Sequence, residues 1–308
     1  MSDILTITFN PAIDKSFNVQ ALLCGRKLAC TKPRFEAGGG GINVARAIKQ
    51  LGGDVTAVFL GGGANGEELS RLLEVKNVPA WRIAIPGATR ENIIINTCAD
   101  GKQYLFDLPG PKISRSDWKR CLEAVRQTTC RFIVVSGSLP PGVPLTVYRE
   151  LAAIARKKNA KLLVDAAGPA LQAALQAGVF LVKPNLREIT AIAGMEATET
   201  NAIAAAQQYV QDGRCDYILV SLGKSGALLV QTGGAVRIHP PHMHAKGSVG
   251  AGDSLLAGLV LALSKKKTIR EAATYGVACG TAATLNEGTA IFRKADVNRF
   301  YKLMKAKN

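Results

Sequence analysis

RFIVVSGSLPPGVPLTVYRELAAIARKKNAKLLVD, residues 131–165, contains the repeating unit that decides the fold. An apolar run at 131–137 is followed by a segment with apolar residues at helical spacing, 145–158, and by a second apolar run, 161–165. Short runs rich in Val, Ile and Leu are typical of strands that are buried on both faces of a parallel sheet. A strand, a helix and a second strand in this order therefore predict two parallel strands joined by a crossover helix.

The same alternation continues through most of the 308 residues. It predicts further strands at 54–60, 179–185 and 216–223, and further helices at 42–51, 116–128, 186–193 and 202–211. Such a chain forms an α/β fold of three layers, with a mostly parallel central sheet and helices on both faces. Residues 15–35 and 86–108 interrupt the alternation, and their pattern predicts a few antiparallel strands outside the main sheet. We expect a single domain, 1–308, with a small β lid contributed by these two regions.

Composition and charge narrow the class of protein. The formal net charge of +16 favours anionic partners, from phosphorylated metabolites to nucleic acid. No basic run is interleaved with aromatic residues, as single-strand binders require, so we expect no nucleic-acid partner. The seven cysteines contain no CxxC pair and indicate free thiols in a reducing cytoplasm. No apolar run reaches the roughly 18 residues of a membrane span, and MSDILTITFN predicts a strand rather than a signal peptide, so no membrane partner is expected.

A first glycine-rich stretch, GSVGAGDS at 247–254, places Gly250, Ala251 and Gly252 directly before Asp253 and an apolar run. Glycines let the backbone approach a ligand closely. The first amides of a helix have no internal partner, so phosphate oxygens can bind to them. Asp253 in this place can take a proton from an attacking hydroxyl. In the alternative interpretation it is only the N-cap of the helix, for which Asp is a favoured residue.

A second glycine-rich stretch, EAGGGGINVARAIKQLGG at 36–53, leads directly into an amphipathic helix. It has neither the spacing of a Walker A loop nor that of a GxGxxG fingerprint. Asn43 is predicted in the first helical turn, where its amide can contact a sugar hydroxyl; the alternative is a flexible turn with close helix packing. Polar residues also follow other predicted strands, in SGSLPPG, KPNLRE and SLGKSG. Ligands of parallel sheets gather at such strand ends.

Together the two glycine-rich stretches resemble the signature motifs of the ribokinase-like, phosphofructokinase B family of carbohydrate kinases. The resemblance extends from TFNPAID near the start to TLNEGTA near the end, and so covers nearly the whole chain. SGSLPPGV, LVKPN and AATLNEGT are similar to the phosphosugar kinases of that family. The resemblance implies a ribokinase-like fold and ATP-dependent phosphorylation of a ketohexose phosphate, first of all fructose 6-phosphate to fructose 1,6-bisphosphate.

The resemblance also implies roles for single residues. Asp253 is expected to be the catalytic base, and the amides of Gly250, Ala251 and Gly252 are expected to form the anion hole. The residues expected to bind the sugar, besides Asp253, are Asp14, Lys27, Gly39, Asn43, Arg90 and Ser138. Those expected to bind ATP are Lys183, Asn185, Ser221, Gly223, Ser248, Gly250, Gly252 and Asn286. Mg²⁺ is expected at Glu188 through water, and K⁺ at oxygens of Val249, Ala283, Asn286 and Gly288.

One position departs from the pattern of the phosphosugar kinases. Ala29 stands where they carry an arginine that helps to bind the sugar phosphate. Tagatose 6-phosphate and fructose 1-phosphate therefore stay open as substrates. Arg90 and Lys27 are the candidate cations for the phosphate, and arginine matches it with a bidentate fork. The contrasting class is a non-catalytic binding protein that responds to a sugar or a nucleotide. In related kinases two lids pack together, so a homodimer through the lid is expected.

Overall fold

The main sheet lies at the centre of the computed structural model, which describes residues 2–243, 247, 249–285 and 291–306. Its strand order is β13-β12-β11-β10-β9-β8-β1-β4-β5. The neighbours from β11 to β5 are parallel, while β11–β12 and β12–β13 are antiparallel. The strands are β1 (Ile4–Thr8), β4 (Val55–Gly61), β5 (Ala80–Ala84), β8 (Phe132–Ser136), β9 (Lys161–Asp165), β10 (Val179–Val182), β11 (Cys215–Ser221), β12 (Ala227–Gln231) and β13 (Gly234–Ile238).

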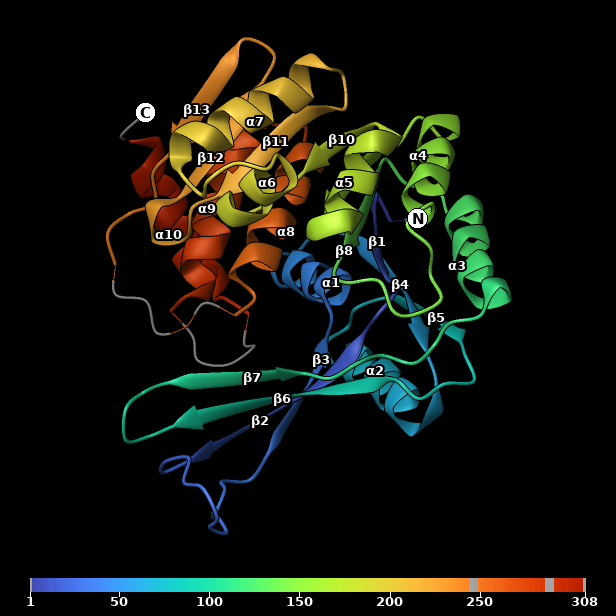
Figure 1. Ribbon diagram of the computed structural model, residues 1–308, viewed down its shortest axis with the longest axis vertical. Coiled ribbons are helices and arrows are strands. Elements are labelled where there is room, and N and C mark those ends of the chain that lie inside the picture. The colour runs from blue at the N-terminus through green and yellow to red at the C-terminus, as the bar shows by residue number, and fades with distance from the viewer. Residues whose placement is uncertain (1, 244–246, 248, 286–290, 307–308) are drawn as a thin grey trace.

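Helices cover both faces of this sheet (Figure 1). They are α1 (Gly40–Gln50), α2 (Gly63–Val75), α3 (Arg115–Gln127), α4 (Val147–Lys157), α5 (Gly168–Ala177), α6 (Leu186–Ile192), α7 (Glu199–Gln211), α8 (Ala251–Ser264), α9 (Ile269–Ala283) and α10 (Lys294–Lys305). Alternate residues of one strand point to opposite faces, so Val134 joins the core under α1, α8 and α9, whereas Ile133 and Val135 join the core under α3, α4 and α7. The predicted three-layer α/β fold with a mostly parallel sheet is confirmed. In the described part of the chain, no helix is long and apolar enough to cross a bilayer.

A second sheet, of four strands in the order β3-β2-β6-β7, stands away from the main sheet (Figure 1). Its strands are β2 (Ala12–Val19), β3 (Arg34–Gly38), β6 (Arg90–Thr97) and β7 (Gln103–Asp107). The expectation of antiparallel strands only is wrong for the central pair, because β2 and β6 are parallel. They follow β1 and β5, two strands of the parallel main sheet, and therefore leave its same end in the same direction.

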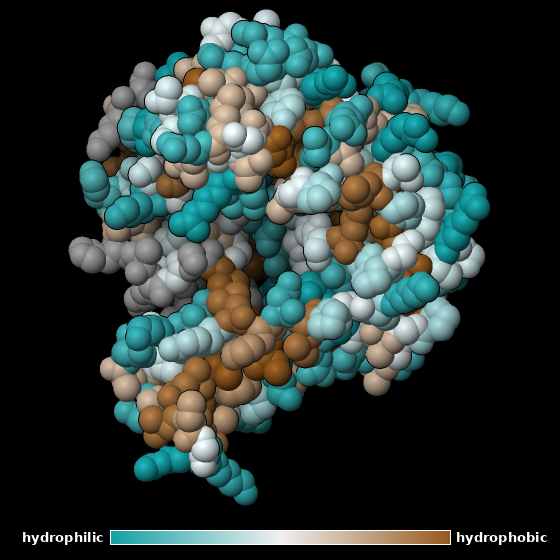
Figure 2. Space-filling model, viewed as in Figure 1, coloured by the Kyte–Doolittle hydropathy of each residue, from teal (hydrophilic) through white to brown (hydrophobic). Residues whose placement is uncertain are grey.

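Hydrophobic side chains are exposed on this four-stranded sheet and on the segments that adjoin its strands, which together we call the lid (Figure 2). They are Leu22, Leu23, Phe35, Leu105, Phe106 and Leu108. Cross-strand register brings Phe35, Lys15, Ile93 and Phe106 into one row, and directly opposed residues share a face of the sheet. Contiguous apolar surface of this kind marks an interaction site more often than it marks an ordinary protein surface.

Candidate active site

Asp253 lies in the first turn of α8, at the carboxyl edge of the main sheet. The helix starts after Gly250, which adopts the left-handed conformation with φ 73°, and no side chain caps it. Interpreting Asp253 as a mere N-cap is therefore wrong. Its carboxylate instead accepts a hydrogen bond from Asn43 Nδ2 at 3.0 Å and lies 3.3 Å from the hydroxyl of Ser136. These partners come from α1 and β8, so three segments distant in sequence fix this one carboxylate.

The environment of Asp253 opposes its ionisation. Burial, together with the nearby charge of Asp165, raises the pKa of Asp253 to about 7, against the hydrogen bonds from Asn43 and Ser136 and the charge of Lys183. Removal of a carboxyl group from water disfavours its charged form. A carboxyl group with a pKa near neutrality is suited to general base catalysis at physiological pH, because it can both accept and release a proton there.

Lys183 follows β10 and reaches the same place from the neighbouring part of the sheet. Its ammonium lies 3.1 Å from Asp165, at the end of β9, and the residue is only 5 % exposed. Burial alone lowers the pKa of Lys183, but the charge of Asp165 and its hydrogen bond outweigh this and raise it. A Cβ atom at Gly252 would stand 3.3 Å from the Lys183 ammonium. The bare backbone at the start of α8 therefore faces a fixed positive charge, as an anion site requires.

Asp14 lies on the lid strand β2 and is the second buried carboxyl group of the site. It accepts a hydrogen bond from Asn92 Nδ2 at 2.9 Å. Burial raises the pKa of Asp14 to about 6, against the hydrogen bond from Asn92 and the charge of Arg46. A Cβ atom at Gly38 would lie 2.4 Å from the carboxyl atoms of Asp14. Any residue larger than glycine at position 38 would therefore clash with the Asp14 carboxylate.

Arg90 begins β6 at the junction between the lid and the main sheet. Its Nη1 donates to Asp107 at 2.5 Å and to the carbonyl of Leu108 at 2.8 Å, and its Nη2 donates to the carbonyl of Asn10 at 3.3 Å. The buried Nε of Arg90 has no partner. Buried donors are almost always satisfied in proteins, so this one points to a ligand or to water.

Asn10 connects this junction to Ser138. Its Nδ2 donates to the Ser138 hydroxyl at 2.9 Å, while its buried Oδ1 has no partner. The Oδ1 of Asn92, whose amide holds Asp14, is also buried and without a partner. Unsatisfied polar atoms thus gather around Asp14 and Arg90, where a polyhydroxylated ligand would supply the missing hydrogen bonds.

The chain matches the pfkB family carbohydrate kinase pattern over residues 8–295. It belongs to the pfkB family of carbohydrate kinases. The ATP-dependent 6-phosphofructokinase isozyme 2 of Escherichia coli K12 is 40% identical over 304 residues, which are 98% of each chain. The 1-phosphofructokinase of Bacillus subtilis is 31% identical over 286 residues, 92% of this chain and 93% of that one. The solved structure of phosphofructokinase-2 from Escherichia coli in complex with potassium has a TM-score of 0.94 and 39% identity, covering 99% of this chain and 100% of that chain.

Three residues that this pfkB kinase was expected to use for ATP, Asn185, Ser221 and Gly223, lie beyond β10 and β11 together with Glu188, which was expected to hold Mg²⁺. Asn185 caps α6, and its side chain and that of Glu188 form a reciprocal capping box, with bonds of 2.9 and 2.8 Å. An isolated parallel bridge joins Asn185 to Ser221. Gly223 follows with φ 57°, a conformation that glycine adopts without strain. These four residues thus line one edge of the main sheet, next to Lys183.

The remaining expected site residues of the kinase differ in where they lie, and some fall outside the described part of the chain. Ser248, Asn286 and Gly288 fall outside the described residues. Val249 precedes α8 and Ala283 ends α9. Gly39 caps α1 with φ 104°. Lys27 is exposed in the loop between β2 and β3, beyond the end of β2 opposite to Asp14, and the structure does not bring it to the Asp14–Arg90 cluster.

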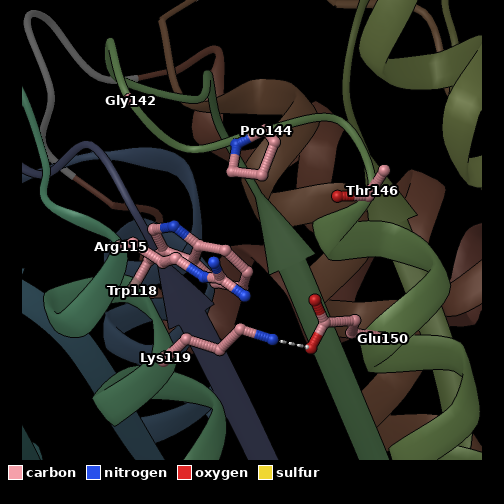
Figure 3. A pocket seen from close by; sticks show the side chains of 7 residues that line it. All are labelled: Arg115, Trp118, Lys119, Gly142, Pro144, Thr146 and Glu150. Atoms are coloured by element: carbon pink, nitrogen blue, oxygen red, sulfur yellow. Dashed lines mark hydrogen bonds and ion pairs between the residues drawn. The ribbon is translucent and has the colours of Figure 1, made fainter.

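A separate pocket of about 340 Å³ lies between α3 and α4 (Figure 3). It is lined by Arg115, Trp118, Lys119, Gly142, Pro144, Thr146 and Glu150. The Lys119 ammonium and the Glu150 carboxylate, 2.6 Å apart, neutralise one another at its edge. None of the expected site residues lines it.

Four residues of the site were missed by the sequence analysis: Ser136, Asp165, Arg46 and Asn10. Asp165 ends the predicted strand 161–165 and Ser136 is the penultimate residue of the predicted strand 131–137; ligands of parallel sheets gather at such strand ends, so these positions were a usable signal. The roles of Arg46 and Asn10 depend on contacts with other segments that no local pattern shows.

We expect Gly38→Ala to weaken sugar binding selectively. The added Cβ would displace the Asp14 carboxylate, since no room exists for both. Loss of a hydrogen bond to a charged group amounts to about 1.5–3 kcal/mol, or about 10- to 100-fold in KM for the sugar. Steady-state kinetics with each substrate varied in turn measure the effect. An equal rise in KM for ATP would contradict it.

The stability of the kinase should depend on pH through Asp253. Its pKa is about 7 when folded and near 3.8 when unfolded, so between these values the folded state holds a proton that the unfolded state has lost. The free energy of unfolding therefore falls as pH rises from about 4 to about 7, at about 1.4 kcal/mol for each pH unit at most. Urea denaturation of the wild type and of Asp253→Asn at pH 4.5 and pH 8 isolates this contribution, because Asp14 titrates in both proteins. The variant should gain stability relative to the wild type at pH 8; an identical difference at both pH values would refute this.

Proposed function

We propose that this kinase transfers the γ-phosphoryl group of ATP to a ketohexose phosphate, with fructose 6-phosphate as the preferred acceptor. The observation that carries the proposal is the placement of Asp253: a buried carboxylate with a pKa near neutrality, at the bare start of a helix and beside the Lys183 ammonium. The 40% identity to an ATP-dependent 6-phosphofructokinase supports the choice of acceptor. The 31% identity to a 1-phosphofructokinase keeps fructose 1-phosphate as an alternative, together with tagatose 6-phosphate.

In the proposed reaction, Asp253 takes the proton of the attacking sugar hydroxyl. The amides of Gly250, Ala251 and Gly252 hold the transferring phosphoryl group, and Lys183 balances its charge. Phosphoryl transfer needs little covalent chemistry from a protein, so positioning and charge stabilisation supply most of the rate. Asp14 and Asn43 orient the sugar, and Arg90 binds the phosphate that the sugar already carries.

Mg²⁺ fits the described residues as a partner of ATP rather than as an ion in a protein cage. The described part of the chain holds no cluster of three or more His, Cys, Asp or Glu side chains that could bind a metal. Mg²⁺ keeps several waters and is usually bound through one or two carboxylates plus the phosphates of a substrate. Glu188 would hold it through water, and when bound the ion neutralises phosphate charge.

A K⁺ site at backbone oxygens of Val249 and Ala283 is also part of the proposal. The last carbonyl groups of a helix have no intrahelical partner, and Ala283 ends α9. The Escherichia coli relative has been solved in complex with potassium. We place the kinase in the cytoplasm, because its seven cysteines are free thiols, which a reducing compartment preserves.

The decisive test measures ADP release from Mg-ATP with fructose 6-phosphate, tagatose 6-phosphate, fructose 1-phosphate and unphosphorylated fructose. The highest kcat/KM with fructose 6-phosphate is the expected result. A higher value with another phosphosugar would correct the acceptor and leave the reaction class standing. No turnover of any sugar, with ATP still bound, would favour a non-catalytic binding protein.

The lid is the proposed dimer interface. Phe35 and Phe106 are exposed in the row that also contains Ile93, and a second lid would cover them. We expect the wild type to sediment as a dimer at micromolar concentration and Phe106→Asp to sediment as a monomer, because a carboxylate would be buried without a partner. Leu303→Asp, at an exposed apolar position of α10, is the matched control. A monomeric wild type would overturn this interface.

A further inference from the structure

Arg46 on α1 is a buried cation that the proposed reaction does not use. Its side chain is only 5 % exposed. Nη2 donates to Glu36 Oε1 at 2.9 Å, and Nη1 donates to the Ala37 carbonyl at 2.6 Å and to Asn43 Oδ1 at 3.3 Å. Burial of a guanidinium is costly, so its hydrogen bonds must be well satisfied. Two of its three partners lie on the lid strand β3, and the third is the residue that contacts Asp253.

The bond from Arg46 determines which way the Asn43 amide faces. A guanidinium can only donate hydrogen bonds, so the group of Asn43 that faces it must be the carbonyl oxygen. The NH₂ group then faces Asp253 and donates to its carboxylate at 3.0 Å. Without Arg46 the amide can turn by half a rotation and present its oxygen to Asp253 instead, an arrangement that favours a protonated carboxyl group.

We propose that Arg46 is a positioning residue for the catalytic base: it fixes the Asn43 amide toward Asp253 and ties that orientation to the lid. The inference rests on the proposed role of Asp253 in phosphoryl transfer. A donor facing a carboxylate stabilises its ionised form, which is the form that accepts the proton. Arg46 therefore keeps the base available at neutral pH without touching it.

The other groups around Asp253 are independent of Arg46. Ser136 comes from β8, Asp165 from β9 and Lys183 from the segment after β10, all on the main sheet. Ser136 and Lys183 favour the ionised carboxylate, and Asp165 opposes it. Asn43 is the partner of Asp253 that Arg46 links to the lid.

The link to the lid joins the two acids of the site. Glu36 lies opposite Asp14 in the register of β2 and β3, and the charge of Arg46 lowers the pKa of Asp14 against the effect of burial. The Arg46 guanidinium thus contacts Asn43, which is bonded to Asp253, and β3, the strand that pairs with β2 beside Asp14. The contacts of β3 with Arg46 brace the guanidinium that holds the Asn43 amide.

The test compares the pH profile of kcat in the wild type, Arg46→Met, Asn43→Ala and the double variant. Arg46→Met should move the acid limb upward by about 0.5–1 pH unit, so that turnover falls more at pH 6.5 than at pH 8.5. In the Asn43→Ala background, Arg46→Met should add no further shift. A uniform fall in kcat at every pH, or additive shifts, would overturn the proposal and leave Arg46 a structural role.

A second readout does not need turnover. Carbon NMR of protein labelled at aspartate carboxyl groups follows the titration of Asp253, which is assigned by its loss in Asp253→Asn. The midpoint should rise in Arg46→Met, and an unchanged midpoint would overturn the inference even if the kinase acts on a different substrate. If Arg46→Met folds poorly, the double variant Glu36→Gln/Arg46→Met removes both charges together, which proteins tolerate better than removal of one. Failure of the proposed function appears separately, as a wild type without turnover whose Asp253 still titrates as expected.

Discussion

Asp253→Asn should lower kcat by about 10²–10⁴-fold while the protein stays folded. The amide has nearly the same shape as the carboxylate and can still meet Asn43 and Ser136, but it cannot accept a proton from the sugar hydroxyl. The same change also removes a buried group that resists ionisation, so the folded state should not be weakened at neutral pH. ADP release under saturating substrates measures the first effect, and urea denaturation measures the second.

Asp216→Asn is the matched control, because Asp216 is exposed on β11. It should leave kcat unchanged. The result that contradicts a base at Asp253 is an Asn variant that retains more than about a tenth of wild-type turnover. Urea denaturation of Asp253→Asn at pH 8 shows whether a loss of turnover comes with a loss of folding.

Arg90→Met should abolish the preference for a phosphorylated sugar. Two charge-assisted hydrogen bonds to a phosphate amount to about 3–6 kcal/mol, so kcat/KM for fructose 6-phosphate should fall at least about 10²-fold. The kcat/KM for unphosphorylated fructose should change little, since it has no group for Arg90 to bind. Arg90→Lys keeps the charge but not the fork and should recover only part of the loss.

The ratio of the two kcat/KM values is the informative quantity, because Arg90 also braces the carbonyl groups of Asn10 and Leu108. A variant that only loosened this junction would lose activity toward both sugars in proportion. Arg71→Met, at an exposed arginine of α2, controls for the loss of one positive charge. An unchanged ratio in Arg90→Met would place the phosphate elsewhere in the site.

The strands that the sequence predicted best are those buried on both faces, such as β8, β9 and β11. Their uninterrupted Val, Ile and Leu runs leave little ambiguity. Helices α2 and α5 were not predicted. Helix α2 opens with Gly-Ala-Asn-Gly and buries only Gly66, Leu69 and Leu73, so its apolar stripe is thin. Helix α5 starts with Gly-Pro and is rich in Ala and Gln, which give a weak helical period.

For the site, the glycine-rich motifs identified Asp253 and Asn43, because each of these residues adjoins in sequence a glycine-rich stretch that belongs to the same site. Asp165 and Ser136 were missed because their proximity to Asp253 follows from the strand order β10-β9-β8, a property of the whole sheet. Arg46 was missed for a related reason. It looks like any polar residue of an amphipathic helix until β3 is placed against it.

The four-stranded sheet joins the rest of the chain at four crossings: β1 to β2, β3 to α1, β5 to β6, and β7 to α3. Asp14 and Arg90 stand on one side of these crossings, and Asp253, Lys183 and Asp165 on the other. Two residues proposed to bind the phosphosugar thus lie in sequence segments separate from the residues proposed for phosphoryl transfer. Substitutions confined to two short segments, residues 12–38 and 90–107, can therefore change sugar selectivity and leave the phosphoryl-transfer residues unchanged. A chimaera that exchanges these two segments with those of a relative should acquire the sugar preference of that relative while its phosphoryl-transfer residues stay the same.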